Sequence, residues 1–535
     1  MMTEEERRRW ENDRRMIRLY NSLEGILKRH NSVEYILAMG CRLHECIQDE
    51  AKWRHTPLFR VVHSIEACCA YTRGHSRDPV TLNRLFKAMN VYHEHSDPMQ
   101  QDALSHGSLQ FLLLAHREQM ELQYSHSQDD FGRAMILFAE PGAVPRSSKA
   151  FNEKYGLTPF QWIKLCFLSA TAAAMHTAGL FGISAVYDYV REAGLRETLP
   201  DESVAAFFAL ASRTPRQIGE SFREERRKLP RYLHSCIRSA LLETPLIAIG
   251  PENGTNEHMI LVLRDLLFRL GNDGLYRLMK GLDQFDSEIG AGFEAYIGRV
   301  LQCSEGAIKH FGEAELKKAT RGKSCDFLIE LPEAVVLVET KAVSFVKTSL
   351  TDKSIMEETS TRQIAKAVQQ LYATAYDLKT GRLDHLKLDK SKPLLGIVVT
   401  LGEIPLVNLD WYFDTFIMAL ASPKLEPPVF PAENLTRRPI SMSARTFEQL
   451  VMACNALKTS PVALFDQKQT MHPALVGDWN TYLDQIIRDN QGEIRCLPFI
   501  RSQNVRLMVS LGVPEEKAKE TVIHRGTEGV VASDP

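Results

Sequence analysis

The sequence predicts a protein of the α+β or α/β class, in which a large, all-helical N-terminal region precedes a mixed β-sheet core flanked by helices. Up to about residue 285, apolar residues recur at helical spacing, as in residues 19–27 and 263–270. After Asp286 the pattern changes to one helix, three short β-like runs, a long helix and a further strand. The composition is close to the average of globular proteins, which excludes collagen-like, coiled-coil and wholly disordered chains.

Size and charge limit the function classes. The chain has 535 residues, of which 44% are hydrophobic and 25% charged, with a formal net charge of −2. This length predicts two to four domains, and the near-neutral charge restricts any nucleic-acid surface to a local patch. The 10 cysteines are scattered without a CxxC pair, and the N-terminal residues have no apolar core typical of a secretory signal. We therefore expect a protein of the reducing cytoplasm.

One apolar segment raises the question of a membrane span. Leu165–Tyr187 contains no Asp, Glu, Lys or Arg, but Gly179 and Gly182 interrupt its second half and several hydroxyl side chains lie within it. A span needs about 20 mostly apolar residues. A buried helix followed by a turn is the favoured interpretation, and a membrane tether is the alternative.

The elements after Asp286 follow one another closely. We predict a helix at Glu288–Leu301, followed by three strands at Ala314–Ala319, Cys325–Leu331 and Ala334–Val343. A long helix at Ile355–Leu378 and a strand at Leu394–Leu401 come next. An aromatic helix at Trp411–Leu420 and a strand at Ile440–Ser443, which leads into a helix to Leu457, complete the series. The predicted domains are residues 1–285, a helical recognition or regulatory region; 286–465, the sheet-containing domain; 466–513, a helical extension; and 514–535, a disordered tail. Contacts across residue 285 should then resemble an interface between domains.

The residues that carry chemistry lie on two adjacent predicted strands. Glu339 and Lys341 are two residues apart and so share one face at the end of an apolar strand, while Asp326 precedes them on the neighbouring strand. A turn centred between Pro332 and Glu333 pairs residues whose numbers sum to 665, which sets Asp326 opposite Glu339. Two opposed carboxylates favour a hard cation such as Mg²⁺ or Mn²⁺ between them. Such a site supports phosphodiester hydrolysis, with Lys341 offsetting charge on the phosphate.

This arrangement resembles the PD-(D/E)xK, or restriction-endonuclease-like, nuclease superfamily over about residues 286–403 and at most to 460. Asp326, a gap of 12 residues and then Glu339-Thr340-Lys341 carry the resemblance, with Cys325 standing where the pattern has proline. The resemblance implies that Asp326 and Glu339 bind metal, that Lys341 is catalytic, and that Glu294 on the preceding helix is an auxiliary metal ligand. It also implies a nuclease acting on nucleic acid, with DNA favoured over RNA, in prokaryotic antiphage or mobile-element defence.

Further positions are candidates for a role in this function. Some superfamily members use a glutamine and a tyrosine on the following helix, and Gln369 and Tyr372 share a face there, although ordinary helix packing is the alternative. A basic cluster could contact nucleic acid or form a solvated helix face; its members are Arg223, Arg226, Arg227, Lys228 and Arg231. Residues 286–347 hold 8 Lys or Arg against 10 Asp or Glu, so substrate affinity is expected to depend on the helical region.

A rival function class remains open. The same fold could serve a non-catalytic protein that binds nucleic acid or a partner, and the helical region could mediate homo-oligomers or a partner complex. The presence of Asp326, Glu339 and Lys341 together favours the enzyme, since a degenerate copy is expected to have lost one of them.

Overall fold

The computed structural model describes the chain from residue 7 to residue 524 with gaps. The described residues are 25–29, 32–39, 58–71, 129–175, 180–228, 239–250, 259–262, 270–317, 324–344, 358–424, 435–471, 479–490 and 496–524, and the single residues 7, 11, 14, 18, 22 and 87.

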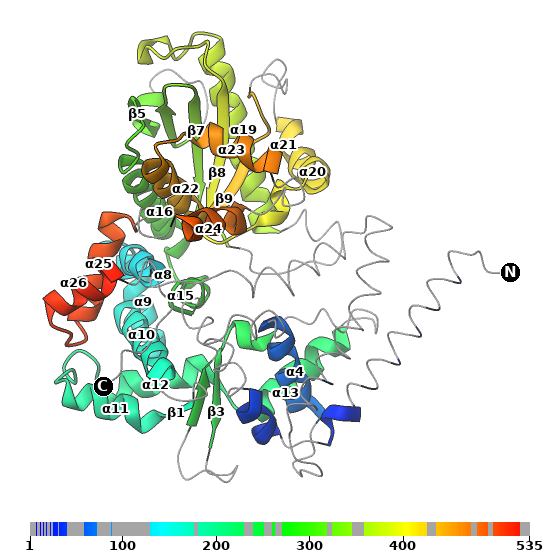
Figure 1. Ribbon diagram of the computed structural model, residues 1–535, viewed down its shortest axis with the longest axis vertical. Helices are drawn as coiled ribbons and strands as arrows, with labels where there is room; N and C mark the ends of the chain where they lie inside the picture. Colours follow the sequence, from blue (N-terminus) through cyan, green and yellow to red (C-terminus); the bar gives the residue numbers. More distant parts are fainter. Residues whose placement is uncertain are drawn as a thin grey trace.

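A five-stranded mixed sheet forms the larger of two sheets (Figure 1). Its strands, in spatial and chain order, are β5 (Lys309–Gly312), β6 (Phe327–Glu330), β7 (Val335–Lys341), β8 (Leu394–Thr400) and β9 (Ile440–Ser443). The β5-β6-β7 pairs are antiparallel, and the β7-β8-β9 pairs are parallel. Helix α16 (Phe285–Gln302) precedes the sheet, and α19 (Thr359–Lys379) connects β7 to β8. The predicted mixed sheet with flanking helices is therefore confirmed.

The two faces of this sheet belong to different hydrophobic clusters. Along β7, Val336 and Val338 join a cluster that includes α16 and α22 (Ala444–Leu457), whereas Val335 and Leu337 join a cluster with α19. This alternation follows the two-residue period of a strand, and it accounts for the uninterrupted apolar run. Helices cover both faces, so the sheet lies inside the molecule.

The N-terminal region contains a second sheet, so the prediction that it is all-helical is wrong. Strands β1 (Leu180–Gly182), β4 (Met259–Val262), β3 (Leu246–Ile249) and β2 (Ser212–Arg213) form a four-stranded sheet in that order, at the opposite end of the molecule in Figure 1. These strands have two to four residues. An apolar run this short cannot be told from a helical segment by its periodicity.

Helices make up most of the other described residues of the N-terminal region. They are α4 (Leu58–Tyr71), α8 (Asp129–Ala134), α9 (Pro145–Tyr155), α10 (Pro159–Met175), α11 (Ile183–Glu192), α12 (Asp201–Ala211), α13 (Pro215–Lys228) and α15 (Leu275–Met279). The segment 165–187 comprises the end of α10, strand β1 and the start of α11, with residues 176–179 outside the described residues. Trp162, Ile163 and Cys166 of α10 are fully buried. The buried helix of the favoured interpretation is confirmed, whereas the turn expected after it is not seen among the described residues, because 180–182 form β1 and 176–179 are not described. No described helix is both long and apolar enough to cross a membrane.

The hydrophobic core is continuous across residue 285. One cluster contains residues from Phe131 to Leu511 and includes Phe285 itself. Glu288 of α16 caps the N-terminus of α9 by accepting hydrogen bonds from Arg146 N, Ser147 N and Ser147 Oγ at 3.0, 3.0 and 2.7 Å. The division into domains at residue 285 stays a prediction. Among the described residues, the hydrophobic core is not interrupted at that position.

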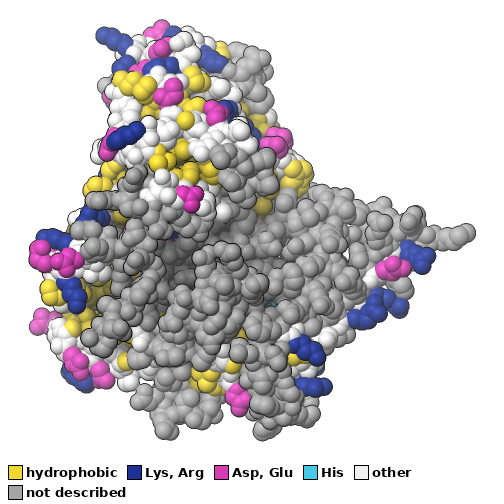
Figure 2. Space-filling model, in the orientation of Figure 1, with side chains coloured by type: hydrophobic (Ala, Val, Ile, Leu, Met, Phe, Trp, Pro, Cys, Tyr) yellow, Lys and Arg dark blue, Asp and Glu magenta, His cyan; other side chains and the backbone are white. Residues whose placement is uncertain are grey.

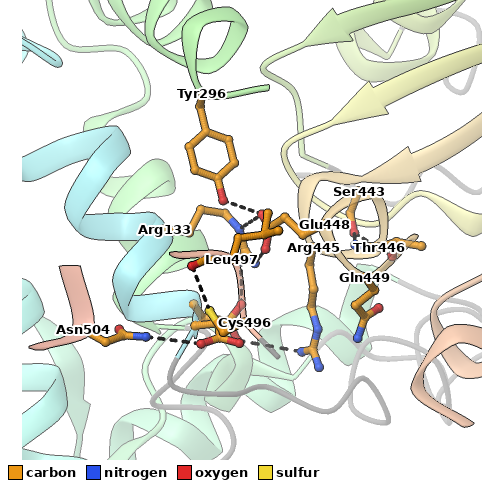
Figure 3. A network of polar contacts seen from close by, with 12 residues as sticks. Arg133, Tyr296, Ser443, Arg445, Thr446, Glu448, Gln449, Cys496, Leu497 and Asn504 are labelled. Carbon is orange, nitrogen blue, oxygen red and sulfur yellow. Dashed lines mark hydrogen bonds and ion pairs between the residues drawn. The ribbon is translucent and has the colours of Figure 1, made fainter. Parts of the chain in front are cut away.

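A buried polar network joins the same two parts of the chain (Figure 3). Arg133 of α8 donates to both carboxylate oxygens of Glu448 on α22 at 2.7 Å and to Asp130 at 2.7 Å. Tyr296 of α16 donates to the same Glu448 at 2.5 Å. Because a buried charge is costly unless it is paired, this network fixes three helices from distant parts of the sequence against one another.

Two local predictions after residue 300 are wrong. The segment Ala314–Ala319 was predicted as a strand, but β5 ends at Gly312 and Glu313–Leu316 form helix α17, with Gly312 N donating to Glu315 Oε2 at 3.0 Å. The predicted disordered tail begins with helix α26 (Glu515–His524), in which Ala518 is buried, and residues 525–535 lie outside the described residues. Helices α20 (Asp410–Tyr412), α21 (Ala419–Ala421), α23 (Pro461–Met471), α24 (Trp479–Asp489) and α25 (Pro498–Val509) complete this part.

Candidate active site

The candidate site lies where β6 begins and β7 ends. The β6–β7 ladder pairs Phe327 with Val338 and Glu330 with Val335, so paired residue numbers sum to 665 as predicted. Leu331 N donates to Ala334 O at 2.8 Å and closes the turn between the strands. Continuing this register by one residue sets Asp326 opposite Glu339, although Asp326 itself lies just outside the ladder.

Asp326 is held by the strand across from it. Its Oδ2 accepts hydrogen bonds from the backbone N and the Oγ1 of Thr340, at 2.7 and 2.6 Å. Burial raises the pKa of Asp326, against the lowering effect of the two bonds from Thr340. None of the described residues donates a hydrogen bond to the other oxygen, Oδ1. The aspartate is therefore fixed in orientation with one oxygen left for a ligand.

Glu339 is the most buried charged group of the site. Its side chain has 0% exposure, its Oε1 pairs with Lys341 Nζ, and its Oε2 has no hydrogen-bond partner among the described residues. Burial raises the pKa of Glu339 to about 8; the Lys341 ammonium counteracts this shift and the Asp326 carboxylate adds to it. The pairing of Glu339 with Lys341 agrees with their predicted placement on one strand face.

Helix α19 contributes a glutamine that the sequence analysis missed. Gln370 Oε1 accepts a hydrogen bond from Lys341 Nζ at 3.1 Å, and its Nε2 donates to Ser324 O at 2.9 Å. The proposed auxiliary Gln369 instead donates to the carbonyls of Leu420 and Ala421, at 3.4 and 3.1 Å. Tyr372 is buried in the α19 hydrophobic cluster. The structure thus puts Gln370 in the site, and the contacts of Gln369 and Tyr372 are those of helix packing.

Two further carboxylates act on the site. Burial raises the pKa of Glu294 on α16, and the negative charges of Asp326 and Glu313 raise it further. Glu313 on α17, which the sequence analysis did not single out, pairs with Lys317 at 2.6 Å. The charge of Asp326 therefore acts on Glu294, whose role as an auxiliary metal ligand stays a prediction.

The donor set suits a cation that keeps part of its water shell. Among the described residues, no group of three or more His, Cys, Asp or Glu side chains is arranged to hold a metal ion. Mg²⁺ needs fewer protein ligands, since it is commonly held by one or two carboxylates and several waters. Glu339 Oε2 is a buried acceptor without a donor among the described residues. Asp326, which carries the second carboxylate, lies just before the neighbouring strand β6. The residues present therefore fit Mg²⁺ or Mn²⁺ better than a zinc centre.

Comparison with known proteins adds no assignment. The chain matches no known family model, no curated protein and no solved structure.

The basic cluster at the end of α13 is largely engaged within the protein. Arg223 donates to Ala70 O at 2.6 Å, and the Arg226 guanidinium stacks over the Tyr71 ring at 5.4 Å while also donating to its hydroxyl. Lys228 pairs with Glu224 and Glu225 at 3.2 and 2.6 Å. Arg227 is exposed, and Arg231 lies outside the described residues. Two of these side chains thus hold α13 to the end of α4.

Proposed function

We propose that this protein is a metal-dependent nuclease of the PD-(D/E)xK type that hydrolyses phosphodiester bonds, with DNA as the favoured substrate. The observation that carries the proposal is the convergence of Asp326, Glu339 and Lys341 at one end of the β6–β7 pair. The order of α16, three antiparallel strands, α19 and a parallel strand supports the superfamily assignment.

Each residue has a distinct role in this proposal. Asp326 and Glu339 would hold Mg²⁺ or Mn²⁺ through the oxygens that have no donor, with Glu294 as an auxiliary ligand. When bound, such a cation polarises a phosphoryl oxygen and acidifies a coordinated water. Lys341 supplies a positive charge that stabilises negative charge on the phosphate, and Gln370 holds its ammonium in place.

The charges on the described part of the visible surface are of both signs. Figure 2 shows Lys and Arg interspersed with Asp and Glu over the described part of the visible face. Sequence-independent binding of nucleic acid depends on clustered Lys and Arg, and no such patch dominates this part of the surface. Antiphage or mobile-element defence is part of the proposal only through the superfamily resemblance.

The test is cleavage by the purified full chain. Supercoiled plasmid, linear DNA and RNA are incubated with Mg²⁺, Mn²⁺ or EDTA, and products are resolved by electrophoresis. We expect metal-dependent cleavage, lost by about a hundredfold or more in Asp326→Ala, Glu339→Ala and Lys341→Ala. Gln370→Ala should lower the rate, whereas Gln369→Ala on the same helix should not.

The outcome also separates the rival function. Binding of nucleic acid without cleavage under every metal condition would favour a non-catalytic binding protein. Three site variants that cut as fast as the wild type would rule out the nuclease assignment.

A further inference from the structure

The backbone leading into Asp326 is fixed by helix α19 and not by the sheet. Strand β6 begins at Phe327, so residues 324–326 precede the ladder. The amide N of Cys325 donates to Thr374 Oγ1 at 2.9 Å, and Ser324 O accepts from Gln370 Nε2 at 2.9 Å. Two side chains one helical turn apart thus hold the C=O and the N–H of the single peptide group between Ser324 and Cys325, directly before Asp326.

The Thr374 hydroxyl is oriented for this contact. Its side chain has 0% exposure, and its Oγ1 donates to Gln370 O at 2.8 Å within the same helix. Because the hydroxyl proton is directed to that carbonyl, the oxygen presents its lone pairs to Cys325 N. A buried threonine therefore acts as a fixed acceptor for the amide of Cys325, which lies two residues before strand β6.

We propose that Thr374 is a positioning residue, which orients the Asp326 carboxylate by holding the amide of Cys325; this inference rests on the proposed nuclease function. Proline at position 325 would make the contact unnecessary. A proline has no N–H to satisfy, and its ring fixes φ without help from the helix. The chain thus uses a helix-to-strand hydrogen bond where a proline would restrict the backbone by itself.

A double-mutant design tests this role in the full chain. Thr374→Val keeps the shape of the side chain and removes the acceptor, and Thr374→Ser keeps the acceptor. We expect kcat for plasmid cleavage in Mn²⁺ to fall about tenfold or more in Thr374→Val with KM unchanged, because the catalytic geometry is lost while substrate binding is not. Thr374→Ser should keep the wild-type kcat. Cys325→Pro, introduced into the Thr374→Val variant, should restore the kcat that the valine lowers.

A matched control comes from the end of the same helix. Thr380 Oγ1 also donates to the carbonyl four residues earlier, Tyr376 O, at 2.9 Å, but it receives no hydrogen bond from a strand amide among the described residues. Thr380→Val should therefore leave kcat unchanged. A similar loss of kcat in both valine variants would mean that the intrahelical bond matters and not the contact with Cys325, which overturns the proposal.

Amide hydrogen exchange supplies a readout that needs no cleavage. We expect faster exchange at Cys325 in Thr374→Val than in the wild type and protection restored in Thr374→Ser. Unchanged exchange together with wild-type kcat in Thr374→Val would overturn the proposal, as would a loss of kcat with unchanged exchange. If the wild type cuts no nucleic acid, the proposed function fails, and the exchange at Cys325 still decides whether Thr374 holds this backbone.

Discussion

At the residue scale, the site combines two carboxylates that burial destabilises in their charged form. Burial raises the pKa of both Asp326 and Glu339. The negative charge of Asp326 raises the pKa of Glu339 further, and that of Glu313 raises the pKa of Asp326. Only one positive side chain, Lys341, pairs with Glu339 in the described structure. A group of this kind is stabilised when a cation binds, because the cation replaces the lost hydration of the carboxylates.

The first prediction concerns Asp326→Asn. Its side-chain carbonyl can still accept both hydrogen bonds from Thr340, while the buried charge is removed. We expect the variant to melt in EDTA at or above the wild-type temperature. Metal at about 100 times its Kd should stabilise the wild type by about 2.7 kcal/mol and the variant by much less.

Asp377→Asn is the matched control for thermal melting. Asp377 lies near the C-terminal end of α19, and its carboxylate pairs with the Arg382 guanidinium at 2.7 Å. The Asp377→Asn variant should therefore lose stability in EDTA but keep the full metal-induced shift. An Asp326→Asn protein that keeps the wild-type shift would show that Asp326 does not bind the cation.

At the element scale, buried side chains hold helices to neighbouring segments. Glu66 of α4 accepts hydrogen bonds from Ser239 Oγ, Ala240 N and Leu241 N at 2.8, 2.6 and 3.3 Å, and so caps the short 3-10 turn Ala240–Leu242. Burial raises the pKa of Glu66 to about 7 in spite of these bonds. The contact between α4 and this turn therefore depends on pH.

The second prediction follows from the sign of that shift. Below about pH 4 the carboxyl is protonated in both states, and its contribution to stability is fully present. As pH rises toward 7, the Glu66 carboxyl ionises in the unfolded chain but keeps its proton in the folded chain, so the free energy of unfolding falls by about 3 kcal/mol in all.

Urea unfolding between pH 4 and 8 should show a smaller pH dependence for Glu66→Gln than for the wild type. Glu153→Gln, at an exposed glutamate of α9, should match the wild-type slope; identical slopes for all three proteins would contradict the prediction.

At the scale of the whole molecule, one core and one buried network unite both halves of the chain. Glu448 receives Arg133 from α8 and Tyr296 from α16, and Arg445 lies 3.9 Å from Asp130 and 3.6 Å from Asp484. The N-terminal half therefore supports α16, the helix that carries Glu294. Tyr276 of α15 adds a contact next to the candidate site by donating to Ala342 O, directly after β7, at 3.1 Å.

The third prediction tests this network. Glu448→Ala should destabilise the protein by about 3–5 kcal/mol, because it leaves the Arg133 guanidinium buried with one partner fewer. Glu305→Ala, which removes an exposed ion pair with Lys458, should cost at most about 1 kcal/mol. Chemical unfolding of both variants gives the comparison, and equal small losses would show that the network contributes little.

The sequence predicts the sheet domain better than the N-terminal region for physical reasons. The apolar strands β7 and β8 are seven residues long and fully or almost fully buried, so their patterns stand out. Strands β1 to β4 have at most four residues, and their pairing depends on partners as distant as Leu180 and Leu261. The helix α17 was missed because Glu313–Leu316 is a single turn, which local side-chain hydrogen bonds decide.

Within the candidate site, the sequence alone determined the β6–β7 hairpin and the arrangement of Asp326, Glu339 and Lys341, because strand alternation and a short turn are local properties. Only the tertiary structure decided that Gln370 and not Gln369 reaches Lys341, since the rotation of α19 about its axis is set by the packing of its apolar face. It likewise decided that one core spans residue 285, because that core is built from contacts between apolar faces far apart in the chain, which no local pattern specifies.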